Sequence, residues 1–188
     1  MEQNDLLLTP DWVWHGLGNE SADNGAYWID LLDDPLVGVL KTIFFEVRDE
    51  DYQSLPINNA SPYHFRWRDI LESLEKVESG EDSGGLQRVK LDTPSIATMA
   101  MFMERLRKKE TYSPPKTTAN DIFVVAQGSG TTRVGDQSFS WSYGDVIAVP
   151  SWTNYSHEPA ETAILLRVTD QPVMEALGWF RTENNSTE

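Results

Sequence analysis

The chain has 188 residues, of which 30 are Asp or Glu and 15 are Lys or Arg, so its formal net charge is −15. The absence of cysteine excludes a disulfide scaffold, a Cys-ligated zinc site and a thiol nucleophile. The acidic balance argues against binding to nucleic acid or to an anionic membrane, and the length fits one domain, or one domain with an appendage.

The chain begins with the acidic segment Met1–Asp5, where a secretory signal would be basic. The apolar run Leu6–Leu8 is too short for a signal sequence, and no run reaches the length of a membrane-spanning helix. We therefore expect a cytoplasmic protein with no membrane partner.

Residues 1–48 contain short segments with β-strand character, separated by proline and glycine. The three segments are Trp12–Trp14, Ala26–Leu32 and Val37–Val47. Residues 49–91 are more polar and are predicted to form a connector. Its one short helix is expected at about residues 68–78, where apolar residues fall on one face, and the run Ser79–Gly85 is predicted to be a loop.

Residues 92–181 are predicted to be rich in strands, because turn residues such as Gly135-Asp136 separate short β-type runs. This close spacing is typical of an all-β barrel or sandwich. The segment Asp92–Lys109 is compatible either with a helix that starts at Thr93-Pro94 or with a core strand. The predicted strands are Ile122–Ala126, Thr131–Val134, Ser138–Trp141, Val146–Val149 and Ala163–Val168.

An internal repeat connects the two ends of the chain. Asp5, Pro10 and Trp12 recur 140 residues later, and Asp34–Val37 is echoed by Asp170–Val173. Identities in the same order at a nearly constant offset indicate two copies of one unit. The first copy begins at its middle, because nothing upstream of residue 1 corresponds to residues 96–143.

The second copy resembles a cupin, a small β-barrel in which two signature motifs place three His and usually one Glu around a metal. Pro115 and Thr117 stand at the first two His positions, Asp121 at the Glu position and Tyr155 at the third His position. The spacing of the motifs is kept, while every ligand position carries a different residue.

The chain resembles, more specifically, the gentisate 1,2-dioxygenase group of two-barrel cupins. Thr9–His15 is similar to the closing signature of that group's first barrel, and Trp28–Val37 is similar to the strand that follows it. Segments that resemble the second barrel are Gly128–Thr132, Gly144–Val146, Val149–Trp152 and Ala176–Arg181.

This resemblance implies an all-β fold with a cupin-type jelly-roll barrel, also described as a double-stranded β-helix. The barrel would span residues 92–181, after a partial first cupin at residues 1–48 and the connector at residues 49–91 with its short helix. Residues 182–188 would form a tail.

The same resemblance implies an oxidoreductase that opens the ring of a salicylate- or gentisate-type aromatic acid with O₂ at a non-haem Fe(II). Three His hold the iron in that group, and neutral imidazoles leave positions open for substrate and O₂. Here His15 matches one ligand and the His-x-His pair is absent, so we expect impaired activity from this chain alone. Asp30, on the next strand, is the candidate to orient a substrate hydroxyl or a ligand imidazole.

Two other functions remain open. A metal-free cupin enzyme would use Tyr155, His157 or Asp121 for acid–base chemistry on a small aromatic or polyketide-like metabolite. Alternatively, the chain is a non-catalytic module for binding or oligomerisation, with a cavity filled by side chains and His15 as a surface histidine. An incomplete first unit leaves strand edges unpaired, so we expect a homo-oligomer.

Overall fold

The computed structural model describes residues 1–19, 21–47, 49, 61–77, 86–93 and 95–183. The chain divides into two compact units. The first, which we call the C-terminal unit, contains Met1–Leu8 together with Tyr63–Glu188, and the second contains Thr9–Pro62. The predicted loop Ser79–Gly85 lies outside the described residues.

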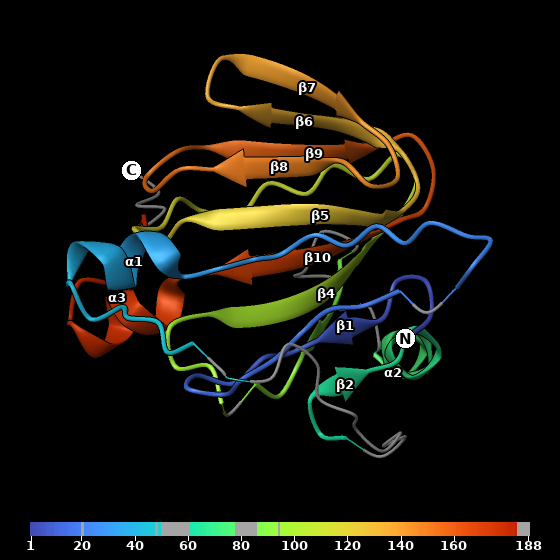
Figure 1. The fold of residues 1–188 in the computed structure, drawn as a ribbon. Helices are drawn as coiled ribbons and strands as arrows, with labels where there is room; N and C mark the ends of the chain where they lie inside the picture. Colours follow the sequence, from blue (N-terminus) through green and yellow to red (C-terminus); the bar gives the residue numbers. More distant parts are fainter. Residues whose placement is uncertain (20, 48, 50–60, 78–85, 94, 184–188) are drawn as a thin grey trace. The chain divides into compact units, whose positions relative to one another are not determined.

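The C-terminal unit is built on two antiparallel sheets (Figure 1). The larger sheet has the strand order β3 (Gln87–Lys90), β4 (Ala100–Leu106), β10 (Ala163–Thr169), β5 (Asp121–Gln127) and β8 (Val146–Val149). The smaller sheet has the order β7 (Gln137–Trp141), β6 (Gly130–Val134) and β9 (Tyr155–Pro159). Two facing sheets confirm the predicted all-β jelly roll, although the hydrogen-bonded strands form no closed ring within the described residues.

The five strands predicted from residue 122 onward are confirmed, with ends shifted by at most one residue. The ambiguous segment Asp92–Lys109 contains strand β4, which was the interpretation that the family resemblance favoured. Strand β9 was not predicted, because its sequence Tyr-Ser-His-Glu-Pro is polar and ends in proline. Strand β3, from the predicted connector, pairs with β4 and so extends the larger sheet.

The predicted helix is present as α2 (Trp67–Lys76), which buries Ile70 and Leu74. Beside it, β1 (Leu6–Leu7) pairs with β2 (His64–Phe65). Asp5 ties these elements together, because its carboxylate accepts hydrogen bonds from the backbone of Glu2 and Trp67 and contacts His64 Nε2 at 2.8 Å. Burial alone would raise the pKa of Asp5, but these hydrogen bonds outweigh it and lower the pKa.

The strands predicted in residues 9–47 are wrong. The described residues of this unit contain one element, helix α1 (Asp34–Val39), and no strand at Trp12–Trp14, at Ala26–Leu32 or in the rest of Val37–Val47. Asp-Pro at the start of α1 favours a helix, because proline is preorganised for the first helical turn. The other apolar segments have no partner strand among the described residues, and an unpaired strand is not stable by itself.

The internal repeat predicted from the sequence has a counterpart in local structure. Glu2 N donates to Asp5 Oδ2 at 2.8 Å, and Ser142 N donates to Asp145 Oδ2 at the same distance. Both turns lead directly into a strand, β1 in one case and β8 in the other.

A second pair of segments repeats in the same way. Helix α1 and helix α3 (Gln171–Ala176) have six residues each, follow an Asp N-cap and carry proline in the first turn. Each helix is followed by a residue in the left-handed region, with φ of 55° at Lys41 and 69° at Gly178. These matching turns support a common origin of the two segments.

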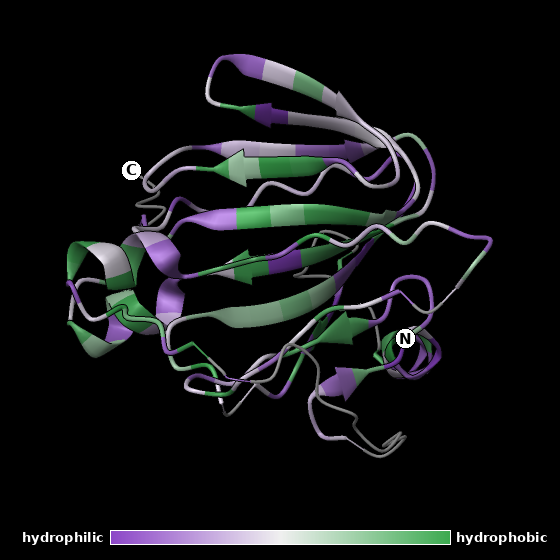
Figure 2. Cartoon of the chain, viewed as in Figure 1, coloured by the Kyte–Doolittle hydropathy of each residue, from purple (hydrophilic) through white to green (hydrophobic). Residues whose placement is uncertain are grey.

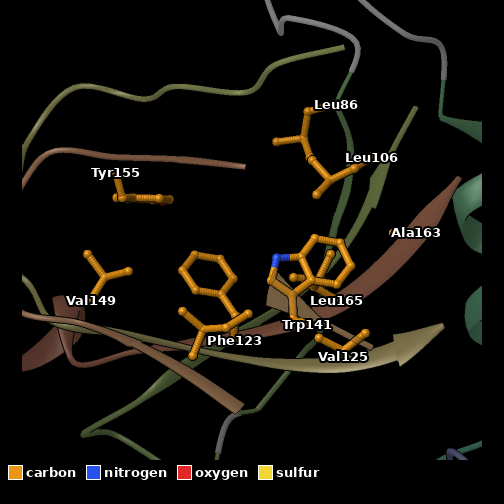
Figure 3. Packing of buried hydrophobic residues seen from close by; sticks show 10 residues of the cluster. Leu86, Leu106, Phe123, Val125, Trp141, Val149, Tyr155, Ala163 and Leu165 are labelled. Atoms are coloured by element: carbon orange, nitrogen blue, oxygen red, sulfur yellow. The ribbon is translucent and has the colours of Figure 1, made fainter. Parts of the chain in front are cut away.

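The core of the C-terminal unit lies between its two sheets (Figure 3). In this view Tyr155 and Val149 lie at one end of the labelled cluster, and Leu86 and Leu106 lie at the other. Within the described residues, no helix has the length and apolar character needed to cross a membrane.

Candidate functional site

A cavity of about 230 Å³ lies in the C-terminal unit, at the Tyr155 end of the core. All four residues at the cupin ligand positions line it: Pro115, Thr117, Asp121 and Tyr155. The motif spacing thus identified residues that are far apart in sequence and meet at one cavity.

These four side chains do not form a metal site. Proline has no side-chain donor, and the Asp121 carboxylate already accepts a hydrogen bond from Arg167 Nε at 2.8 Å. Across the described ranges, no group of three or more His, Cys, Asp or Glu is arranged to hold a metal ion. The described residues therefore do not fit the Fe(II) that the family resemblance implies.

A row of alternating charges includes Asp121, which stands at the Glu position of the metal-ligand motif. It runs across four neighbouring strands, from Arg88 on β3 and Glu104 on β4 to Arg167 on β10 and Asp121 on β5. Arg88 Nε donates to Glu104 Oε1 at 2.7 Å, and Arg167 Nη1 lies 3.9 Å from the same oxygen. Arg88, Arg167 and Asp121 line the cavity. Glu104 does not line it and is only 1% exposed.

The charged row keeps its arginines protonated. Burial disfavours the charged form of Arg167, but Asp121, Tyr155 and Glu104 outweigh this effect and raise its pKa. Burial likewise opposes the charge on Arg88, and Glu104 reverses the effect and raises the pKa of Arg88. For Glu104, burial raises the pKa while the two arginines act against that shift. The cavity therefore presents permanent guanidinium groups.

Two tyrosines add neutral hydroxyl groups to the same cavity. Tyr112 accepts a hydrogen bond from Arg88 Nη2 at 2.8 Å, so its own proton is available to another acceptor. Burial raises the pKa of Tyr112, with Arg88 acting against the shift. Burial, followed by the negative charge of Asp121, also raises the pKa of Tyr155. Both side chains are neutral phenols at neutral pH, which disfavours a phenolate at Tyr155.

His157 is fully buried beside this site and does not line the cavity. Its Nδ1 lies 2.6 Å from Thr132 Oγ1, which also accepts a hydrogen bond from Trp141 Nε1 at 2.8 Å. Its Nε2 has no hydrogen-bond partner among the described residues. Burial, followed by the charge of Arg167, lowers the pKa of His157 to about 4, so the imidazole is neutral at pH 7. Acid–base roles for Tyr155 and His157 stay predictions.

The other two candidate residues belong to the Thr9–Pro62 unit. His15 is exposed, and its Nδ1 lies 3.0 Å from the carbonyl oxygen of Val13. Asp30 is exposed as well. Their roles as an iron ligand and as a positioning residue stay predictions.

Arg88, Glu104 and Arg167 were not predicted from the sequence. Glu104 and Arg167 could have been recognised, because each is a charged residue in a largely apolar strand segment. Arg167 is the one charged residue in the strand Ala-Ile-Leu-Leu-Arg-Val-Thr, and Glu104 interrupts the apolar start of β4. Figure 2 shows β10 as largely hydrophobic with a hydrophilic band across it. A charge inside an otherwise buried strand requires a partner, so each of these residues predicts an ion pair.

The sequence of the chain is similar to those of ring-cleaving dioxygenases. No protein-family model matches it. It is 31% identical to a 5-aminosalicylate 1,2-dioxygenase from a Comamonas species, over 97% of this chain and 56% of the relative. It is also 31% identical to a gentisate 1,2-dioxygenase from a Haloferax species, over 96% of this chain and 61% of the relative. The resemblance to gentisate 1,2-dioxygenases is confirmed.

A solved structure supports the same assignment at the level of fold. The salicylate 1,2-dioxygenase from Pseudaminobacter salicylatoxidans superposes with a TM-score of 0.70 and 22% identity, over 80% of this chain and 53% of that one. This likeness confirms the cupin-type fold of the gentisate 1,2-dioxygenase-like chain. The chain spans little more than half the length of the relatives it matches.

Proposed function

We propose that this chain is part of a ring-cleaving dioxygenase that acts with O₂ on a salicylate- or gentisate-type aromatic acid. The support is similarity over nearly the whole chain to dioxygenases of 5-aminosalicylate and gentisate. In this proposal Fe(II) is the metal of the whole enzyme and supplies O₂ activation when bound. The predicted homo-oligomer and cytoplasmic location belong to the proposal as predictions.

One observation supports the division of roles in this proposal: the cavity of the C-terminal unit carries Pro115, Thr117, the ion-paired Asp121 and Tyr155 at the cupin ligand positions. Ring cleavage at iron would therefore not occur in this cavity. His15 would be one iron ligand, joined by His residues from outside this chain, and Asp30 would position a substrate hydroxyl. This chain by itself is expected to be inactive.

A chimera tests the assignment of His15. The part of the Comamonas enzyme that precedes the matched region would be joined to this chain, and iron and O₂ uptake would be measured after anaerobic loading with Fe(II). We expect the chimera to hold about one iron per chain and to consume O₂ with gentisate or 5-aminosalicylate, because the ligand set is then complete.

Two further proteins complete the experiment. This chain alone is expected to retain little iron, and the chimera with His15→Ala is expected to lose both iron and O₂ uptake. The chimera with His64→Ala is the matched control, because His64 is already bound to Asp5, and it should retain its iron. Full iron content in the His15→Ala chimera would contradict the proposal.

The observed cavity also favours a second candidate, a metal-free cupin that binds or converts a small metabolite. Neutral hydroxyl groups and two guanidinium groups line one cavity, as in small-molecule binding sites. A cavity that only binds a metabolite, without converting it, is compatible with the dioxygenase proposal.

A further inference from the structure

The Arg167 side chain has binding capacity that the protein does not use. Its Nε donates to Asp121, while the nearest other carboxylate oxygen, on Glu104, is 3.9 Å from Nη1 and beyond hydrogen-bond distance. In the described part of the chain, its two terminal nitrogens donate no hydrogen bond. Arg167 lines the cavity and is only 8% exposed. A ligand in the cavity would therefore contact a largely desolvated guanidinium group.

The opposite type of group is available beside it. Asp121 uses Oδ1 for Arg167, and its Oδ2 accepts no hydrogen bond from the described residues. The hydroxyl group of Tyr155 likewise has no hydrogen-bond partner among them, and Tyr112 retains a proton to donate. The cavity thus offers a cationic donor, neutral hydroxyl groups and one anionic acceptor within a single site.

Part of the remaining lining is apolar, whereas Thr117, Thr153, Gln171 and Thr182 add further polar groups. Pro114, Pro115, Val149 and Pro150 form apolar wall around the polar groups. A volume of about 230 Å³ would hold roughly eight water molecules at the density of the liquid, and it therefore fits a small organic molecule with one ring. An apolar wall with a few convergent polar groups is the usual composition of a small-molecule site.

We propose that this cavity binds, without a metal, a small organic acid that carries a carboxylate and a hydroxyl group on a flat apolar body. The carboxylate accepts hydrogen bonds from the terminal nitrogens of Arg167, and the hydroxyl group donates to Asp121 Oδ2. Tyr155 donates to the ligand from the opposite strand, β9. This cavity is lined by neither His15 nor Asp30, and the proposal holds whether or not the chain belongs to an active dioxygenase.

The charges of the row favour a monoanion with a hydroxyl group over other ligands. The row contains two cations and two carboxylates, so a phosphate dianion would meet about twice the repulsion from Asp121 and Glu104 that a monoanion meets. A purely apolar ligand would leave the Arg167 nitrogens and Asp121 Oδ2 without partners after displacing water. A hydroxy acid satisfies both groups.

Calorimetry of the full chain in the presence of EDTA tests the proposal, with salicylate as the probe because it carries both groups on one ring. We expect one salicylate per chain, and binding weaker by about tenfold or more for benzoate, which lacks the hydroxyl group, and for phenol, which lacks the carboxylate. EDTA removes iron from the outcome, so the result is independent of the chimera experiment.

Two variants test whether salicylate binds in this cavity. Tyr155→Phe keeps the ring and removes the hydroxyl group, and it should weaken salicylate binding about tenfold. Arg167→Lys keeps the charge but not the paired donors of a guanidinium, and it should weaken binding at least as much. Tyr143→Phe is the matched control, because Tyr143 is exposed and absent from the cavity, and its affinity should equal that of the unmodified chain.

The thermal transition of each variant shows whether it is folded before binding is measured. If Arg167→Lys does not fold, the affinity of Tyr155→Phe for salicylate and the comparison of salicylate with benzoate still test the proposal. Absence of binding at millimolar salicylate would overturn the proposal. Equal affinities for salicylate in Tyr155→Phe and the unmodified chain, or for salicylate and benzoate, would overturn it as well.

Discussion

The interior of the C-terminal unit has an apolar part and a charged part, and the same strands build both. On β10, Leu165 packs in the apolar core while Arg167, two residues later, lines the cavity. On β4, Leu106 lies in the core while Glu104, two residues earlier, belongs to the charged row. Residues two apart on a strand face the same side, so one sheet face changes from apolar to charged along its length.

The comparison shows that the two parts contribute differently to stability. Apolar burial stabilises in proportion to the area removed from water, whereas buried ion pairs recover little more than the desolvation cost of their charges. Glu104 and Arg167 are nevertheless kept in the interior, at 1% and 8% exposure. The apolar part therefore accounts for the stability of the unit, and the charged part is suited to recognition.

Truncation of Phe123 in the apolar part is expected to have the largest effect. Phe123 is 0% exposed, and its removal to alanine leaves a cavity, so Phe123→Ala should lower the free energy of unfolding by about 3–5 kcal/mol. Urea unfolding followed by circular dichroism measures this value. Phe139→Ala is the control on β7, where the side chain is 45% exposed, and a change within about 0.5 kcal/mol is expected. Similar losses in both variants would show that the apolar part is not the main source of stability.

Acid should destabilise the unit through His157, which lies beside both parts. The unfolded chain takes up a proton near the ordinary pKa of 6.5, whereas the folded pKa is lowered to about 4. The stabilisation is therefore complete above pH 6.5 and is lost as the pH falls toward about 4, by about 3 kcal/mol in total.

Unfolding in urea at several pH values between these limits measures the loss. His157→Asn removes the titrating ring and retains a side-chain partner for Thr132 Oγ1. The difference in stability between the unmodified chain and this variant should shrink as the pH falls. A constant difference across the range would contradict a neutral, buried His157.

The fold of the C-terminal unit could be predicted because its signals are local. Turns at Gly135 and Gly144 have positive φ, at 56° and 86°, and the runs between turns have the composition of strands. The segments Ala26–Leu32 and Ile43–Val47 have the same composition but no strand structure, because a strand exists only with a partner strand. The amino-acid composition of a segment indicates that it can form a strand. Whether the strand forms depends on hydrogen bonding to a partner strand.

The candidate site could be predicted only in part. Motif spacing placed Asp121 and Tyr155 correctly at one cavity, because spacing along paired strands is preserved when ligand residues are replaced. The partner of Asp121 could not be deduced from spacing, since Arg167 lies 46 residues away and meets it across paired strands. Long-range pairing of this kind depends on strand order, which the sequence does not state.

The smallest expected effect comes from the charged part, at Glu104. Glu104→Gln removes a buried negative charge and leaves Arg88 and Arg167 beside a neutral amide, which still accepts one hydrogen bond. Arg88 is 33% exposed in its side chain, so water replaces part of the lost interaction, and we expect a loss of about 2 kcal/mol in urea unfolding. Glu158→Gln is the exposed control on β9 and should change the stability by less than about 0.5 kcal/mol. A loss for Glu104→Gln as large as that for Phe123→Ala would mean that the charged row stabilises the fold as strongly as the apolar core. That result would remove the distinction between the two parts, because a row that supports the fold needs no ligand to explain why it is buried.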